Sequence, residues 1–440
     1  MFERVFKLKE HGTTPRVELV AGATTFMTMA YIIFVNPGIL ADPHGAAMNF
    51  GAVMAATCIA SALATLVMGF VANYPIALAP GMGLNAYFSF VICGQMGVPW
   101  DIALGIVFIS GVVCCVLALV RAREMILTAI PNSLKLATAG GIGLFIAFIG
   151  LKDAGIVKAD PATLVTLGDL HSPPTLLALF GLTLTAVLFA AKVRGAIFWS
   201  ILVTGVGGLA TGLVKFTGVA ALPSLEPTFL KMRPLAALRV EYLTPIFVLV
   251  FFDLFDTVGT LIGVGQQAGL LKDGKLPRAT RALFSDSVGT VIGATLGTSS
   301  TTSYIESAAG VGAGGRTGLA NVFTALLFLV ALFFSPLAQM FGGGYPAAGG
   351  LLLHPVTAPA LVIVGCLMMR SVAEIPWGDY SEAIPAFLTL IVMPLTNISH
   401  GLAIGFMSYP IIKALSGRGR EVHWLVYCLA ALFVLRYIFI

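Results

Sequence analysis

Long stretches of apolar residues dominate this chain, and short polar breaks separate them. A helix that crosses a bilayer needs roughly 20 mostly apolar residues, and fewer where it is tilted or broken. The first seven predicted segments are residues 20–40, 51–71, 76–94, 101–120, 134–151, 174–191 and 196–216. Seven more follow a longer loop, at residues 243–266, 281–297, 300–314, 318–340, 351–369, 384–398 and 401–415. The pattern predicts an all-α polytopic membrane protein with about 14 transmembrane segments.

Composition excludes most other classes of protein. Of the 440 residues, 58% are hydrophobic and 10% are charged, whereas soluble domains carry about a quarter charged residues. Soluble enzymes, nucleic-acid binders and single-anchor receptors do not fit these values. The apolar runs are continuous and do not alternate with polar residues, so a porin-like barrel is excluded as well.

The residues at the two ends of the chain predict where each end lies. Residues 1–19 are basic and contain no apolar stretch of signal-peptide length, which predicts a cytoplasmic N-terminal segment. Threading the segments from that start places most basic loop residues in the cytoplasm, and the loop 217–242 is the exception. Residues 422–440 form a further hydrophobic stretch. We interpret it as an interfacial helix, because an even number of crossings keeps both termini inside.

Two sets of seven segments predict an inverted repeat, which is common in secondary transporters. The third segment of each half is interrupted by glycines and hydroxyl residues, at residues 79–88 and 297–315. Broken backbone at membrane depth is tolerated only where protein or a cavity surrounds it. We therefore expect the substrate site where these two broken segments, numbers 3 and 10, meet.

A few polar side chains lie inside the predicted spans. Asp253 and Asp256 share one face of segment 8, Glu306 lies in segment 10, and Asn85 is its counterpart in segment 3. An ionisable side chain at the bilayer centre costs roughly 2.5–3.5 kcal/mol on insertion scales, so each one requires a reason. A single buried Asp could simply bind a hydroxyl of a neighbouring helix, but three acids beside broken segments indicate a functional site.

These groups suit a small, planar, polar molecule. Carboxylates and an amide can form hydrogen bonds with ring N–H and C=O groups, and a carboxylate at this depth can also carry a proton. Four aromatic side chains could stack on a flat ring, although packing is the alternative for each: Tyr31, Phe88, Phe255 and Tyr304. Asp286 and Asn321, in segments 9 and 11, could brace the fold, and the sequence does not assign them.

The sequence runs GMGLNAYF, FFDLFDTVGTL and GTSSTTSYIESAAGVGAGGRTGL together resemble those of the AzgA-like purine permeases. This family is a branch of the nucleobase–cation symporter and nucleobase–ascorbate transporter superfamily, and the resemblance covers essentially the whole chain. It implies a core domain of segments 1–4 and 8–11 and a gate domain of segments 5–7 and 12–14. The implied domain boundaries are 20–121 and 243–340 for the core, and 134–216 and 351–415 for the gate.

The resemblance also implies roles for individual residues. Gly83, Asn85, Asp253 and Glu306 match the substrate-binding positions of the family, and Asp256 matches its second acid on segment 8, to which the resemblance gives a less central role. Proton coupling is assigned to Asp256, Glu306 and Asp253 together. Related uracil transporters place a His at the position of Thr257, so the route of the proton is left open.

The implied activity is import of purine nucleobases, namely adenine, guanine or hypoxanthine, by proton symport through alternating access. The implied location is the cell (inner or plasma) membrane, with a homodimer formed through the gate domains. We expect no cofactor beyond the proton gradient, with Na⁺ coupling left open, no metal and no nucleic-acid partner.

Three alternative functions fit the sequence less well. An anion exchanger of the same architecture would need a cationic site, and Arg316 is the only basic residue near the broken segments. An intramembrane enzyme would need a catalytic motif, and neither HExxH nor GxSxG is present. A passive channel would have no need of the buried acids.

Overall fold

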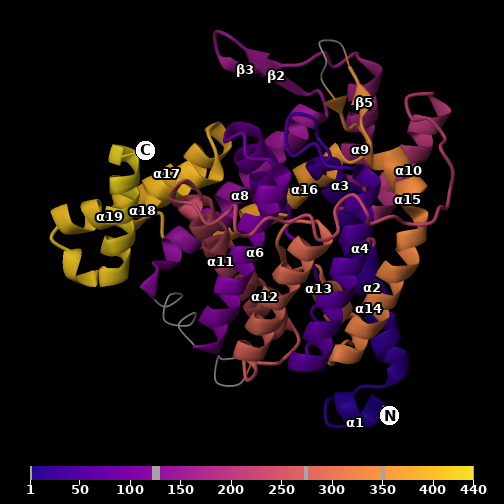
Figure 1. Ribbon diagram of the computed structural model, residues 1–440, viewed down its shortest axis with the longest axis horizontal. Helices are drawn as coiled ribbons and strands as arrows, with labels where there is room; N and C mark the ends of the chain where they lie inside the picture. The colour runs from indigo at the N-terminus through magenta and orange to yellow at the C-terminus, as the bar shows by residue number, and fades with distance from the viewer. Residues whose placement is uncertain (1, 121–128, 272–275, 348–351, 440) are drawn as a thin grey trace. The chain divides into compact units, whose positions relative to one another are not determined.

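The computed structural model describes residues 2–120, 129–271, 276–347 and 352–439 (Figure 1). The chain forms two compact units, which are described separately. Unit 1 comprises Met1–Leu119 and Leu151–Ala360, and unit 2 comprises Val120–Gly150 and Leu361–Ile440. The predicted boundaries at residues 121 and 351 lie outside the described residues.

Unit 1 contains both broken segments. Its first part consists of α1 (Phe2–Phe6), α2 (Pro15–Met29), α3 (Ile32–Leu40), α4 (Phe50–Val67), the π-helix η1 (Met68–Ala72), β1 (Leu78–Pro80), α5 (Met82–Ala86), the π-helix η2 (Tyr87–Gln95) and α6 (Trp100–Leu119). Its second part consists of β2 (Val157–Asp160), β3 (Leu164–Leu167), α9 (Pro173–Ala190), α10 (Ala196–Ala210), the 3₁₀-helix η3 (Val240–Tyr242), α11 (Leu243–Gln267), α12 (Ala279–Leu296), β4 (Thr301–Ser303), α13 (Ser307–Gly312), α14 (Gly318–Ala331), the 3₁₀-helix η4 (Leu332–Phe334), α15 (Ser335–Gly342), β5 (Tyr345–Pro346) and β6 (Leu352–Leu353).

Unit 2 contains the C-terminal helices. It holds most of α8 (Asn132–Asp153) and α16 (Ala358–Met368), followed by the 3₁₀-helix η6 (Met369–Glu374), α17 (Tyr380–Leu395), α18 (Ile398–Leu415), the 3₁₀-helix η7 (Gly419–Glu421) and α19 (Trp424–Phe439). Gly143 of α8 and Gly365 of α16 lie so close that an added Cβ at either position would meet the backbone of the other helix. Small residues thus set the close approach of these two helices, as is typical of membrane helix pairs.

Close packing of small residues also organises unit 1. A Cβ added at Gly22 of α2 would meet the backbone oxygen of Ala320 on α14, and Gly69 and Gly318 approach each other in the same way. Buried Glu18 of α2 accepts hydrogen bonds from the backbone N–H groups of Arg316, Thr317 and Ala320 at 3.0–3.4 Å. A carboxylate at a helix N-terminus satisfies donors that the helix itself leaves unpaired. This contact joins α2 to α14, which lie side by side in Figure 1.

The two broken segments pair with each other. Strand β1 runs antiparallel to β4, with Leu78 opposite Ser303 and Pro80 opposite Thr301. Each strand is followed directly by a short helix, α5 after β1 and α13 after β4. Pairing satisfies backbone groups that would otherwise be exposed inside the membrane. The prediction that segments 3 and 10 are broken into a short strand and a half-helix is confirmed.

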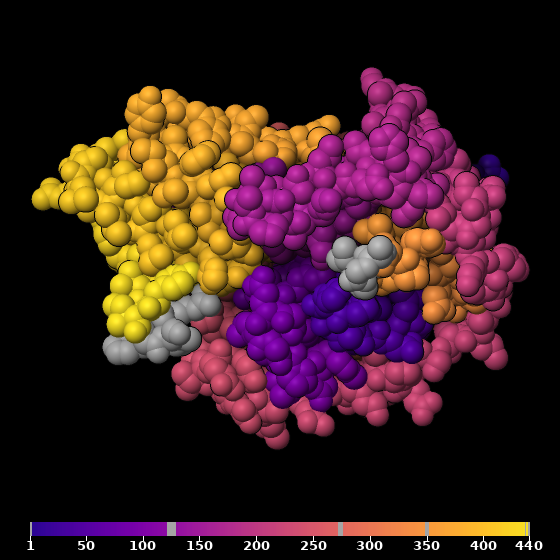
Figure 2. Space-filling view, turned by 90° about the horizontal axis from the view of Figure 1, so that it is seen from above, coloured from indigo at the N-terminus to yellow at the C-terminus, as the bar shows by residue number. Residues whose placement is uncertain are grey.

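The predicted fold class is confirmed. Among the described residues, seven helices are long and apolar enough to cross a membrane, and shorter apolar helices accompany them. The hairpin of β2 and β3 was not predicted, and its mostly exposed residues lie on the surface (Figure 2). Segments 6 and 7 fall in unit 1 by their contacts, so the division into core and gate domains stays a prediction. The interfacial placement of residues 422–440 also stays a prediction.

Candidate functional site

The crossing of β1 and β4 is the structural centre of the candidate site. Thr65 of α4 forms hydrogen bonds of 2.9 and 3.0 Å with both backbone groups of Leu78, and Thr290 of α12 donates to the carbonyl of Thr301 at 2.9 Å. Asn321 of α14 donates to the carbonyls of Thr65 and Ile76. Neighbouring helices therefore hold the two strands in place, and Asn321 is a brace of the fold.

Glu306 lies at the start of α13 and is partly exposed. The hydroxyl of Tyr31, which lies between α2 and α3, donates a 2.6 Å hydrogen bond to its carboxylate. Thr28 of α2 donates to the backbone carbonyl of Glu306 at 3.3 Å. The structure thus brings together Tyr31 and Glu306, which lie 275 positions apart in the sequence.

The two acids of α11 lie within electrostatic reach of Glu306. Asp253 is buried, whereas Asp256, one helical turn later, is partly exposed. Asp256 interacts electrostatically with both Asp253 and Glu306, and the side chain of Thr302 in β4 is a polar neighbour of its carboxylate. The three predicted carboxylates therefore belong to one region of unit 1.

Asn85 lies in α5 and is fully buried. Its side-chain oxygen accepts a hydrogen bond from the hydroxyl of Ser299, just before β4. Its side-chain nitrogen has no partner among the residues that the structure describes. Gly83, two residues earlier, is partly exposed. The amide of Asn85 therefore ties the two broken segments together and retains an unused donor in the interior, which is uncommon in folded proteins.

The four aromatic candidates have different surroundings. Tyr304 is buried and donates a 2.5 Å hydrogen bond to the carbonyl of Pro80, so its hydroxyl joins β4 to β1. Phe88 is fully buried in η2, and Phe255 packs against Phe251 with ring centroids 4.4 Å apart. Of the four aromatic side chains, only Tyr31 forms a described hydrogen bond to one of the three predicted carboxylates, that of Glu306. The burial of Phe88 and the ring contact of Phe255 fit the alternative that these two side chains serve packing.

Two threonines and one further acid were not predicted as part of this region. Thr257 of α11 donates a 2.7 Å hydrogen bond to Asp286 of α12 and lies 3.1 Å from the hydroxyl of Thr302. The hydroxyl-rich run before Glu306 was interpreted only as a helix breaker. Four carboxylates are thus grouped around the paired strands. We call them the strand-crossing acids: Asp253, Asp256, Asp286 and Glu306.

The basic residue nearest to the broken segments, Arg316, is engaged elsewhere. Its guanidinium donates to the backbone carbonyls of Val311 and Gly315 at 2.9 and 2.7 Å. It therefore closes the C-terminal end of α13 and does not approach the strand-crossing acids through any contact described. Within the described part of the chain, no group of three or more His, Cys, Asp or Glu side chains could hold a metal ion.

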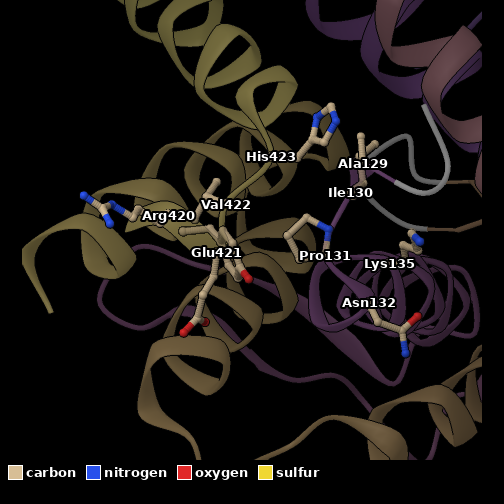
Figure 3. A pocket seen from close by; sticks show the side chains of 10 residues that line it. Ala129, Ile130, Pro131, Asn132, Lys135, Arg420, Glu421, Val422 and His423 are labelled. Atoms are coloured by element: carbon tan, nitrogen blue, oxygen red, sulfur yellow. The ribbon is translucent and has the colours of Figure 1, made fainter. Parts of the chain in front are cut away.

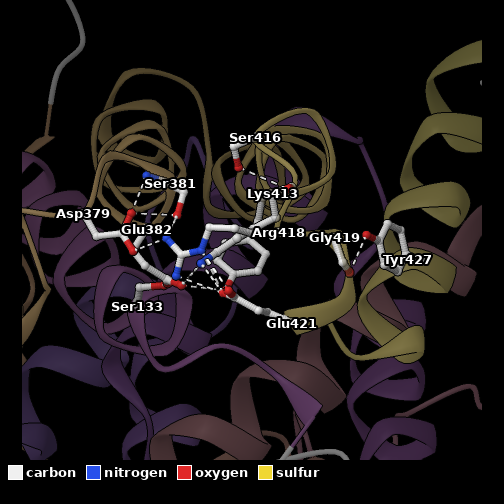
Figure 4. A network of polar contacts seen from close by, with 11 residues as sticks. Ser133, Asp379, Ser381, Glu382, Lys413, Ser416, Arg418, Gly419, Glu421 and Tyr427 are labelled. Carbon is white, nitrogen blue, oxygen red and sulfur yellow. Dashed lines mark hydrogen bonds and ion pairs between the residues drawn. The ribbon is translucent and has the colours of Figure 1, made fainter.

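A second polar cluster lies in unit 2 (Figure 4). Lys413 of α18 is 1% exposed and forms ion pairs with Glu382 at 2.7 Å and with Glu421 at 3.2 Å. Arg418 pairs with Asp379 at 2.7 Å and with Glu421 at 2.9 Å. We call these five residues the ion-pair cluster. Hydrogen bonds from Ser381 and Arg418 lower the pKa of the Asp379 carboxyl to about 2.

A cavity of about 560 Å³ lies beside this cluster (Figure 3). Its lining includes Asn132, Lys135, Arg420, Glu421 and His423. In Figure 3 the guanidinium of Arg420 points away from the side chains of Lys135 and His423. None of the predicted site residues lines this cavity, so it is separate from the candidate site.

Comparison with known proteins identifies the family of this chain. The model of the xanthine/uracil permease family, described as "Permease family", matches residues 16–402. The chain belongs to this permease family. Its members are transporters, so the polar groups at the strand crossing lie inside a multi-pass membrane transporter.

Two relatives match this permease over nearly its whole length. The guanine/hypoxanthine permease PbuG of Bacillus subtilis is 47% identical and covers 99% of both chains. The adenine permease AdeP of Escherichia coli is 44% identical and covers 100% of this chain and 96% of its own. The transmembrane domain of the cyanobacterial bicarbonate transporter BicA has a TM-score of 0.62 at 14% identity, over 88% of this chain and 96% of that one. This last likeness shows that the two proteins share a fold.

Proposed function

We propose that this permease is a secondary active transporter that imports purine nucleobases by proton symport. The observation that carries the proposal is the position of Glu306, a partly exposed carboxylate held by the hydroxyl of Tyr31 beside the two acids of α11. A carboxylate accepts hydrogen bonds from ring N–H groups, which every purine base carries. Guanine, hypoxanthine and adenine are the bases in the names of the relatives.

Each site residue has a proposed role. Glu306 and Asp253 bind the edge of the base, and the free amide donor of Asn85 lies on the neighbouring broken segment. Tyr31 orients the carboxylate of Glu306, and Gly83 leaves room for the base beside α5. Tyr304, Phe255 and Phe88 shape the apolar walls. Asp256 exchanges the coupled proton, because it is an acid next to the base-binding carboxylates that is not fully enclosed.

Transport follows from alternating access, in which the acids face each side of the membrane in turn. The cell (inner or plasma) membrane is the proposed location, with the N-terminus in the cytoplasm and a homodimer formed through the gate domains. The proton gradient supplies the driving force, and we propose no cofactor.

The alternative of an anion exchanger lacks a suitable site in the described part of the chain. The fold is shared with a bicarbonate transporter, but fold alone does not determine the substrate. An anion needs a cationic or donor-rich pocket, whereas four carboxylates surround the strand crossing and Arg316 is bound to backbone carbonyls. These surroundings favour a neutral base over an anion.

The deciding experiment is competition in a reconstituted system. Purified protein in proteoliposomes with an acidic exterior should accumulate labelled hypoxanthine, and unlabelled adenine or guanine should compete. Uracil and bicarbonate should not compete. Dissipating the pH gradient with a protonophore should abolish accumulation, and a Na⁺ gradient should not replace it. Accumulation of labelled bicarbonate with no purine uptake would overturn the proposal.

A further inference from the structure

Asp286 is the one strand-crossing acid to which the proposed function gives no role. It lies on α12 and is fully buried. Its two carboxylate oxygens accept hydrogen bonds from two different elements, one from Thr257 of α11 at 2.7 Å and one from Ser303 of β4 at 3.1 Å. Helices α11 and α12 lie next to each other in Figure 1.

Two hydroxyl groups lead from Asp286 toward Asp256. The hydroxyl of Thr257 lies 3.1 Å from that of Thr302, and either oxygen can be the donor. Thr302 is in turn a polar side-chain neighbour of Asp256. Two hydroxyls therefore bridge a partly exposed acid and a fully buried one.

The described elements that pack against α12, the helix of Asp286, carry acids and no basic side chain. Helix α12 packs against α4, α6, α11, η1, β1 and β4, and none of these elements carries Lys, Arg or His. Arg281 lies on α12 itself, in its first turn. The ionisable groups on the packed elements are Asp253 and Asp256 on α11, Asp101, Cys114 and Cys115 on α6, and Cys58 on α4. Two acids in such surroundings are easier to hold with one proton between them than with none.

The distances are suited to transfer of a proton. The oxygen–oxygen separations of 2.7 and 3.1 Å are those of direct hydrogen bonds, along which a proton can pass. A hydroxyl both donates and accepts, which lets it pass one proton on as it receives another.

We propose that Asp286 is a second proton-holding carboxylate of the transport cycle, which exchanges a proton with Asp256 through Thr302 and Thr257. In the forward step the O–H bond of the Asp256 carboxyl breaks and its proton goes to Thr302. Thr302 passes its own hydroxyl proton to Thr257, and Thr257 passes its proton to Asp286. One proton moves, both hydroxyls are restored, and no electrons are exchanged.

This inference rests on the proposed function, because it gives that function an internal site for the proton. Asp256 can release its proton inward while Glu306 and Asp253 hold the base. The proton then stays inside the protein during the change of access. Binding of the base and storage of the proton are therefore assigned to different carboxylates.

The test replaces the hydroxyl of Thr257 and leaves both acids in place. Thr257→Val removes the bridging oxygen, and Thr257→Ser retains it as a matched control. In proteoliposomes we expect Thr257→Val to lower the steady-state accumulation of labelled hypoxanthine under a pH gradient by at least about tenfold, because the coupled proton no longer reaches Asp286. Its dissociation constant for the base and its exchange of internal for external base should change by less than about threefold. Thr257→Ser should accumulate as the wild type does.

Asp286→Asn provides a second, independent break, since the amide oxygen can accept one of the two hydrogen bonds and the amide N–H can donate to the other hydroxyl, but the amide cannot store the proton. It should exchange bases and fail to accumulate them. Wild-type accumulation by both Thr257→Val and Asp286→Asn would overturn the relay. Equal loss of binding and accumulation in Thr257→Val and Thr257→Ser would also overturn it, because the role would then be structural. Failure of the wild type to bind any purine would overturn the proposed function instead.

Discussion

The strand-crossing acids of unit 1 and the ion-pair cluster of unit 2 differ in the groups that contact their carboxylates. In unit 2, Lys413 and Arg418 contact every carboxylate of the cluster at 2.7–3.2 Å. In unit 1, the hydrogen bonds to Glu306 and Asp286 come from hydroxyls of Tyr31, Thr257 and Ser303. Charges balanced by cations stabilise one arrangement of helices, whereas acids that accept hydrogen bonds from hydroxyls can gain or lose a proton. The difference separates structural acids from functional ones.

The largest effect is expected from removing a functional acid. Glu306→Ala should lower purine uptake by about 100-fold or more, because the base loses a hydrogen bond to a charged group and the hydroxyl of Tyr31 loses its acceptor. Uptake of labelled hypoxanthine and the amount of folded protein in the membrane would be measured together. Normal uptake kinetics in Glu306→Ala would contradict the assignment.

The matched control is Glu382→Ala in the ion-pair cluster. It removes an equally long acid whose partners are Lys413, Tyr409 and Ser133. We expect this variant to have less folded protein but an unchanged Michaelis constant for uptake. An altered Michaelis constant would end the distinction between the two clusters.

The second largest effect is expected on the stability of the folded protein. Lys413→Met should lower the free energy of unfolding by about 2–3 kcal/mol, because it leaves Glu382 without its cation in a site that is mostly enclosed. The value is below that for a fully buried pair because Glu421 is half exposed. Thermal unfolding in detergent, followed by size-exclusion chromatography, would measure it.

The double variant Lys413→Met, Glu382→Gln sharpens this prediction. It removes the unpaired charge together with its partner, so it should recover part of the lost stability. If the double variant loses as much free energy of unfolding as the two single variants together, Lys413 acts through packing of its side chain and not through its charge.

A smaller effect is expected at Tyr31. Tyr31→Phe removes the 2.6 Å hydrogen bond to Glu306 and leaves the ring in place. The dissociation constant for the purine should rise by about tenfold, which is the typical value of a hydrogen bond to a charged group. Equilibrium binding to purified protein would measure it, with Tyr409→Phe as the control because Tyr409 bonds an acid of the ion-pair cluster.

The smallest effect concerns pH. The pKa of Asp379 is about 2 in the folded protein, below its ordinary value of 3.8, so its ion pair stabilises the fold fully above pH 4. That contribution is lost as the pH falls through 2. The thermal stabilities of the wild type and Asp379→Asn should therefore differ at pH 6 and converge toward pH 2. If the two thermal stabilities differ by the same amount from pH 6 to pH 2, protonation of Asp379 does not contribute to the stability of the fold.

Much of the fold was predictable because it follows from local composition. Runs of apolar residues marked the segments, and the glycines and hydroxyls around Asn85 and Glu306 marked the two breaks. Local composition does not encode partners, however. The pairing of Leu78 with Ser303, and the brace from Asn321 to Ile76, depend on residues more than 200 positions apart.

The candidate site was predictable only in part, for a related reason. Charged residues in apolar surroundings are conspicuous, so Asp253, Asp256 and Glu306 could be found. Thr257 and Thr302 could not, because hydroxyl residues are common in membrane helices and each can satisfy itself on its own backbone. Their role depends on the direction in which each side chain points, and only three-dimensional geometry supplies it.

The pairing of β1 with β4 has a consequence for how the protein is made. When the ribosome has produced only the first half of the chain, Leu78–Pro80 has no partner strand, and its backbone groups face an environment without water. The first half should therefore stay close to the insertion machinery until Thr301–Ser303 emerges. Halves expressed separately from a break in the loop 217–242 should be degraded when made alone and should survive when made together.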